Sequence, residues 1–131
     1  MRDYKIEKIE LNRTQKNLVY NSVHMLRHTL QDAVDAGIRS AEDKLLVSDQ
    51  TLVSILFHLK YEKITPEQPT IFLEIDEYGV DLIIHAMYAY IQVMFGMVSA
   101  EDYLQIDSDR IAVWDKIRSK FDVESDKGES V

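Results

Sequence analysis

At 131 residues the chain has the length of one ordinary domain, and its 46% hydrophobic and 29% charged residues are typical of a folded protein rather than a disordered one. The absence of cysteine excludes disulfides, thiolate metal sites and cysteine nucleophiles, and it fits a reducing compartment. The net charge of −8, with no basic patch bearing interleaved aromatic residues, disfavours direct nucleic-acid binding. The first ten residues lack an apolar core and predict no signal peptide, so we expect a cytoplasmic protein.

The first half of the chain predicts one strand followed by two helices. Residues 5–11 form a weak strand pattern, and Asn12 directly after it is a suitable N-cap for a long helix. The apolar residues of that helix recur every three or four positions and are Val19, Val23, Leu26, Leu30, Ala33 and Gly37. We expect Gly37 to end the helix with a positive φ, and Ser40 to begin the next one.

The second half predicts the same order of elements. Residues 70–75, TIFLEI, alternate as a strand does, and Asp76 is the expected N-cap of the following helix. This helix has two apolar seams: Val80, Ile83, Met87, Tyr90, Met94 and Met97 form one, and Ile84, Tyr88, Ile91, Phe95 and Val98 form the other. Two seams indicate a helix that is central in the fold or shared with a partner chain. Gly96 is the expected helix end, also with positive φ, and Ser99 the next helix start.

Residues 82–98 form the only apolar stretch that approaches the length of a membrane span. It contains His85 and Gln92, and no lysine or arginine lies nearby to anchor it, so a buried central helix is favoured. The methionines at 87, 94 and 97 share one seam. A core stripe is favoured for them over an adaptable binding surface.

The connection between the two helices has nearly the same sequence in both halves. GIRSAED at 37–43 and GMVSAED at 96–102 are identical at five of seven positions. Residues 9–22 also match residues 73–86, and five extra residues lie in the first copy between Ser22 and Gly37. Three collinear blocks indicate an internal duplication. A single domain would then contain a first unit at about 5–63, a linker at 64–69, a second unit at about 70–123 and a polar tail at 124–131.

These elements predict a helix-dominated α+β fold made of a duplicated β-α-α unit, with two short strands and about four main helices. A pseudo-twofold axis perpendicular to the sheet would make the two strands antiparallel neighbours. Because a two-stranded sheet is marginally stable alone, the helices must cover one of its faces. The other face or an edge could recruit a second chain, which would give a homodimer.

Neither a catalytic motif nor a metal-ligand cluster is evident. The chain has no G-x-S-x-G, no P-loop and no G-x-G-x-x-G. His24, His28 and Asp32 line one side of the first long helix, opposite its apolar seam, so a solvated face is favoured over a metal site. His58 and His85 stand alone in apolar helices, where packed histidines are favoured over catalytic ones. We therefore expect no enzyme activity, no cofactor and no metal.

Charge is distributed unequally between the two halves. Residues 1–63 have ten basic and nine acidic residues (net +1), whereas residues 64–131 have five and fourteen (net −9). Solvation and helix-dipole stabilisation explain many such acids, and a negative face that attracts a basic partner is the competing explanation. The candidate partner-binding residues are Glu74, Asp76, Glu77, Asp81, Glu101, Asp102, Asp107 and Asp109.

The strand–cap–helix pattern, LEID followed by DLII, resembles that of small uncharacterised phage and prophage proteins. The resemblance covers the first half of each unit and implies no activity, but it suggests a phage protein that acts on a host component. The leading hypothesis is a non-enzymatic inhibitor or adaptor that binds a basic surface of another protein, with nucleic-acid mimicry as a special case. The alternative is a small-ligand-binding protein with a pocket between the units or across a homodimer, for which Tyr88, Tyr90 and Trp114 are candidates.

Overall fold

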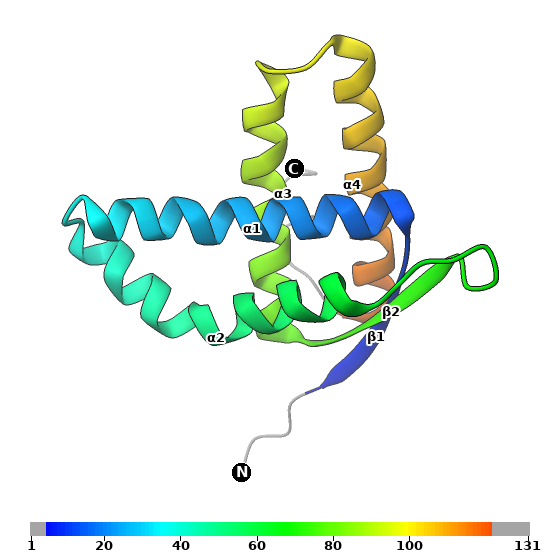
Figure 1. The fold of residues 1–131 in the computed structure, drawn as a ribbon, viewed down its shortest axis with the longest axis horizontal. Helices are drawn as coiled ribbons and strands as arrows, with labels where there is room; N and C mark the ends of the chain where they lie inside the picture. Colours follow the sequence, from blue (N-terminus) through cyan, green and yellow to red (C-terminus); the bar gives the residue numbers. More distant parts are fainter. Residues whose placement is uncertain (1–4, 122–131) are drawn as a thin grey trace.

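A computed structural model describes residues 5–121 and shows a strand and two helices that occur twice in the same order (Figure 1). The elements are β1 (Ile6–Asn12), α1 (Arg13–Asp35), α2 (Arg39–Tyr61), β2 (Thr70–Asp76), α3 (Glu77–Phe95) and α4 (Ala100–Lys120). This confirms the predicted helix-dominated α+β fold. The predicted polar tail at 124–131 lies outside the described residues.

The two strands form an antiparallel sheet with one buried face, as predicted. Ile71, Leu73 and Ile75 alternate inward along β2 and are at most 5% exposed, whereas Phe72 and Glu74 point outward into solvent. Successive side chains of a strand point to opposite faces of the sheet. The face that bears Ile71, Leu73 and Ile75 is therefore the one that the helices cover.

The register of the sheet is consistent with a twofold arrangement of the strands. Ile9 lies directly opposite Leu73, and these two residues occupy matching positions of the sequence repeat. The first long helix is the longer one, 23 residues in α1 against 19 in α3, so most of the extra residues of the first copy lengthen it. Duplication and symmetry of the whole chain stay predictions.

Both outer edges of the sheet accept a hydrogen bond from a flanking helix. On the β2 side, the His58 Nε2 atom of α2 lies 2.9 Å from the Phe72 carbonyl oxygen. On the β1 side, Lys116 of α4 donates to the Glu10 carbonyl oxygen (2.6 Å) and to the Gln15 side chain (2.7 Å). Each helix is thereby tied to the strand that it flanks.

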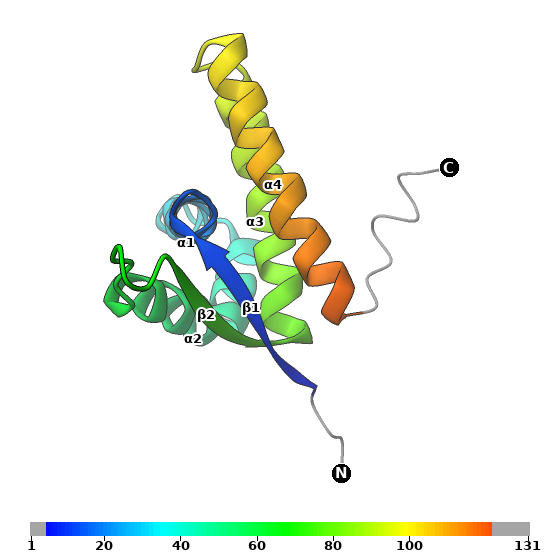
Figure 2. The same cartoon turned by 90° about the vertical axis from the view of Figure 1, so that its right-hand side faces the viewer.

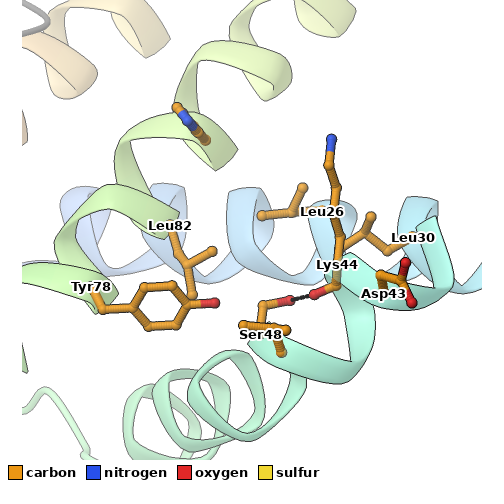
Figure 3. A pocket seen from close by; sticks show the side chains of 9 residues that line it. Leu26, Leu30, Asp43, Lys44, Ser48, Tyr78 and Leu82 are labelled. Atoms are coloured by element: carbon orange, nitrogen blue, oxygen red, sulfur yellow. Dashed lines mark hydrogen bonds between the residues drawn. The ribbon is translucent and has the colours of Figure 1, made fainter. Parts of the chain in front are cut away.

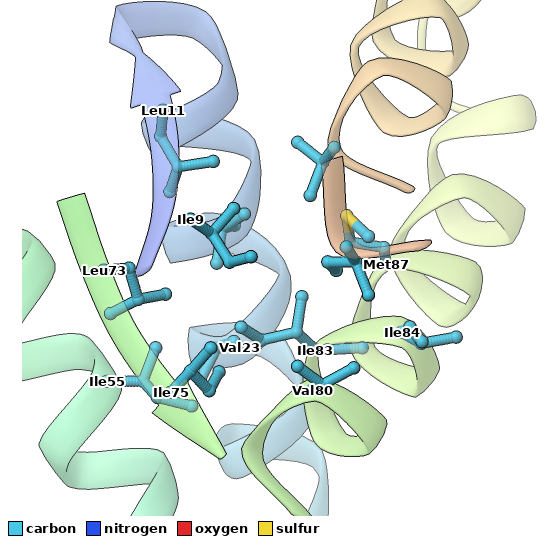
Figure 4. Close-up of a cluster of buried hydrophobic side chains, with 14 of the residues drawn as sticks. Ile9, Leu11, Val23, Ile55, Leu73, Ile75, Val80, Ile83, Ile84 and Met87 are labelled. Carbon is cyan, nitrogen blue, oxygen red and sulfur yellow. The ribbon is translucent and has the colours of Figure 1, made fainter. Parts of the chain in front are cut away.

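The core lies where α1 and α3 cross over the covered face of the sheet (Figures 1 and 2). Side chains from both strands and from α1, α2 and α3 converge there (Figure 4). The two equivalent small residues Ser22 and Ala86 are completely buried on the crossing helices, and α4 adds Trp114 and Ile117 near its end. Within residues 5–121, no helix has the length and apolar character needed to cross a membrane.

Three of the four predicted helix starts are confirmed. Asn12, Asp76 and Ser99 each accept a hydrogen bond from a backbone N–H in the first turn of their helix. The prediction for Ser40 is wrong, because α2 begins at Arg39 and its N-cap, Ile38, makes no side-chain cap. The repeated sequence therefore does not place the helix start at the same residue in the two halves.

The two glycines of the repeated connection differ in backbone conformation. Gly37 has φ +86°, as predicted, but Gly96 has φ −95°, so the prediction of positive φ at Gly96 is wrong. The chain leaves α3 through a right-handed conformation that any residue can adopt.

Alanine at the two glycines should therefore have opposite effects. Gly37→Ala is expected to destabilise the protein by about 1 kcal/mol, because only glycine adopts positive φ without strain. Gly96→Ala is expected to be neutral or to stabilise by up to about 1 kcal/mol, because its site is open and its φ is ordinary. Urea unfolding of the two variants measures both values, and an equal loss in both would contradict the assignment.

Candidate functional site

The distal parts of α3 and α4 project beyond the rest of the molecule (Figures 1 and 2). We call residues 88–110, which include the connection between these helices, the arm. Ile91 is the only buried residue of the arm. The two apolar seams of α3 are thus divided: the first half of the helix is central in the fold, and its end has no third layer of structure against it.

Large apolar side chains are exposed near the tip of the arm. Phe95, Met97 and Leu104 are 70%, 71% and 65% exposed. The Phe95 ring meets the edge of the Tyr103 ring at a centroid distance of 5.1 Å, and this contact leaves most of its surface in solvent. Met97 departs from the predicted core stripe, whereas Met87 on the same seam is buried. Large apolar side chains that are exposed at the end of a projecting pair of helices make this region a candidate for protein interaction.

The geometry of the arm is held at both ends. At the tip, the Asp102 backbone N–H donates to the Ser99 side chain (3.1 Å), which fixes the start of α4. Nearer the core, the Arg110 guanidinium lies 5.0 Å from the centroid of the Tyr88 ring and donates to Asp107 at 2.8 Å. Burial lowers the pKa of Arg110, but the hydrogen bond and charge of Asp107 and the contact with Tyr88 outweigh it, so this pKa is raised and the cation persists.

The eight candidate acidic residues do not form one face. Four of them lie at the end of β2 and the beginning of α3: Glu74, Asp76, Glu77 and Asp81. The other four lie on α4 and belong to the arm: Glu101, Asp102, Asp107 and Asp109. At 1.5 Å per residue, the two ends of α3 are about 27 Å apart. The structure therefore separates Glu77 from Glu101 by most of the length of that helix.

Three of these acids already have structural partners. Asp76 caps α3 by accepting from the Gly79 N–H (2.8 Å), Asp107 pairs with Arg110, and Asp109 accepts from the Thr14 hydroxyl (3.2 Å). Glu101 and Asp102 are exposed beside the apolar tip. These two are the acids of the arm with the most freedom to meet a partner.

The predicted histidine stripe lies on the exposed side of α1. The His24 ring lies between those of Tyr20 and His28, with centroid distances of 6.0 and 6.4 Å. The Nδ1 atom of His28 is 3.3 Å from an Asp32 carboxylate oxygen. No group of three or more histidine, cysteine or acidic side chains within residues 5–121 has an arrangement that could hold a metal ion.

An apolar groove of about 530 Å³ lies between α1, α2 and the beginning of α3 (Figure 3). We call it the groove. Its floor is apolar and its rim is polar; the lining residues are Leu26, Leu30, Asp43, Lys44, Val47, Ser48, Tyr78, Leu82 and His85. Its lining residues come from both halves of the chain.

The aromatic residues proposed for a pocket lie elsewhere. Tyr88 packs against Arg110, Tyr90 is partly buried against the core, and Trp114 is part of the core. None of the three lines the groove. Sequence reasoning did not identify the residues that line the groove, such as Leu82 and Val47, because they belong to no motif. They come together only because three helices pack against one another.

Comparisons with protein-family models, with curated proteins and with solved structures found no match for this chain. Its class is therefore described by the fold alone: over residues 5–121 it is an α+β protein with four helices, a two-stranded antiparallel sheet and an exposed helical arm.

Proposed function

We propose that this protein is a non-enzymatic interaction module that inserts its arm into an apolar groove with a basic rim on another protein. The observation that carries the proposal is the exposure of Phe95, Met97 and Leu104 on a projecting pair of helices. Large apolar anchors surrounded by polar residues are typical of binding hot spots. Occupation of such a groove would make the protein an inhibitor or an adaptor.

The charge of the arm favours a different protein over a second copy of this chain. The arm has four carboxylates and one arginine, a net charge of −3. Two arms packed together would bring like charges into one interface, which costs binding energy and slows association. A partner with lysine or arginine around an apolar groove is complementary to Glu101 and Asp102.

The separation of the acids limits how they can act. The group at the beginning of α3 lies about 27 Å from the tip, at the other end of a 19-residue helix. The candidate acids thus provide no single row of carboxylates, and nucleic-acid mimicry is not part of this proposal. We assign partner attraction to Glu101 and Asp102.

The first experiment identifies the partner and the surface that it contacts. A photo-crosslinking amino acid is placed at Leu104 on the arm, and at Leu46 on α2 as a control, because both side chains are exposed. A protein cross-linked from position 104 and not from 46 is then purified, and its binding is measured with the unmodified chain.

Charge reversal then tests the acidic rim. Glu101→Lys with Asp102→Lys is expected to slow association about tenfold at low salt, with little change in dissociation. Glu42→Lys with Asp43→Lys is the matched control, because these acids occupy the same SAED sequence at the beginning of α2. Thermal melting checks for lost stabilisation at the helix start. Equal slowing by both pairs, or association that is insensitive to salt, would contradict the proposal.

A further inference from the structure

We propose that the groove binds a small ligand that has an apolar body and an anionic head such as a carboxylate. This site is separate from the arm and does not depend on the function proposed for it. The groove is formed by α1, α2 and α3, whereas the arm is formed by α3 and α4.

The size and lining of the groove suit the body of such a ligand. Its volume of about 530 Å³ lies within the roughly 300–1,000 Å³ of small-molecule sites. Leu26 and Leu30 of α1 and Leu82 of α3 form an apolar floor (Figure 3). Val47 of α2 also lines it and is 69% exposed, so a bound apolar body would remove this side chain from water.

The polar groups around the groove favour a head that accepts hydrogen bonds. Lys44 supplies a cation, and Tyr78 directs its hydroxyl toward the groove (Figure 3). His85 adds a ring nitrogen that donates in one tautomer or when protonated. The one carboxylate, Asp43, lies on the side of Leu30, away from Tyr78 (Figure 3). Lys44 lies on the same side as Asp43, so that side has one cation and one carboxylate, and the Tyr78 hydroxyl lies on the other side (Figure 3).

The cation of the groove has no direct ion-pair partner among residues 5–121, although Asp43 also lines the groove. The Lys44 ammonium group makes no ion pair or hydrogen bond with any residue from 5 to 121. Ser48, by contrast, is buried and donates its hydroxyl hydrogen to the Lys44 carbonyl oxygen at 2.7 Å. The ammonium group is thus available to an anionic head, and the serine is already satisfied.

Two fluorescent probes with nearly the same body test the proposal. 1-Anilinonaphthalene-8-sulfonate has an anionic sulfonate, and N-phenyl-1-naphthylamine lacks it. Titration of the whole chain should give tighter binding of the sulfonate. Lys44→Gln is expected to weaken sulfonate binding about threefold to tenfold and to leave the neutral probe unchanged, since a partly exposed ion pair contributes about 1 kcal/mol.

A second pair of variants locates the bound probe. Val47→Glu is expected to weaken binding of both probes at least about tenfold, because it places a charge against their apolar body. Val53→Glu is the matched control, since Val53 is an exposed valine of α2 that does not line the groove. Both variants are checked for unchanged melting before titration.

Three results would overturn the proposal. Equal affinity of the two probes in the wild type would show that the groove takes any apolar group, including the side chain of a partner protein. Equal weakening by Val47→Glu and Val53→Glu would show binding without a defined site. Loss of probe binding on replacement of Phe95 and Leu104 by serine, with no effect of Val47→Glu, would place the probes on the arm.

Discussion

Replacing Phe95, Met97 and Leu104 together by serine is expected to weaken partner binding at least about 100-fold while leaving the fold intact. Truncation of a single hot-spot anchor costs about 2 kcal/mol or more of binding free energy. A 100-fold loss of affinity corresponds to about 2.7 kcal/mol, so the expected loss is reached even if the three effects are not fully additive. Stability should change little, because these side chains are already 65–71% exposed in the free protein.

The control for this variant lies on the opposite part of the molecule. Leu46 and Phe57 of α2 are 81% and 61% exposed, so their replacement by serine removes comparable apolar surface. Titration calorimetry with the partner protein that photo-crosslinking identified measures the affinity of each variant. Binding that is lost with the α2 variant and kept with the arm variant would move the interaction site to α2.

Ala86→Phe is expected to destabilise the protein by about 1–3 kcal/mol or more, the second largest effect that we predict. Ala86 has no exposed surface and belongs to the hydrophobic core on α3, the helix that crosses α1 (Figure 1). A phenyl ring there must displace close-packed neighbours, and protein interiors have little free volume to accommodate it.

Ser22, the residue of α1 that matches Ala86 in the sequence repeat, allows a substitution with the opposite effect on stability. Ser22 is also completely buried, and its hydroxyl has no hydrogen-bond partner among the described residues. Ser22→Ala is therefore expected to stabilise by about 1 kcal/mol, because it removes an unsatisfied polar group. Urea unfolding measures both variants. A tolerated phenylalanine at 86 would show that the helix crossing is loosely packed.

The order of elements could be predicted because each depends on local chemistry. Alternating apolar residues predicted β2, apolar residues every three or four positions predicted α1, and Asn12 and Asp76 marked where helices begin. The antiparallel pairing was predicted from the sequence repeat, since a twofold axis perpendicular to a sheet relates matching strands that run in opposite directions.

The backbone conformation of the α1–α2 and α3–α4 connections could not be predicted, because it depends on tertiary packing and not on the local sequence alone. The same GxxSAED sequence gives Gly37 a positive φ and Gly96 a negative one. The start of α2 at Arg39, one residue before the predicted Ser40, similarly departs from the start of α4, which follows its serine cap. A repeated sequence therefore does not ensure a repeated turn.

The candidate site was predictable only in part. The two apolar seams of α3 correctly indicated a helix with neighbours on more than one side, but periodicity cannot show where along the helix those neighbours end. Met87 and Met97 share a seam and differ from buried to 71% exposed. Counting acids likewise identified eight candidates without showing that α3 divides them into two distant groups.

The hydrogen bonds from His58 and Lys116 to the two sheet edges bear on how the protein behaves at high concentration. An open strand edge is a template on which further strands can add, and this addition leads to fibrils. Here the Phe72 and Glu10 carbonyl oxygens are already occupied, from α2 on one side and α4 on the other. A strand that adds at either edge would have to displace one of these hydrogen bonds, so each edge of this small sheet has a local obstacle to self-templating.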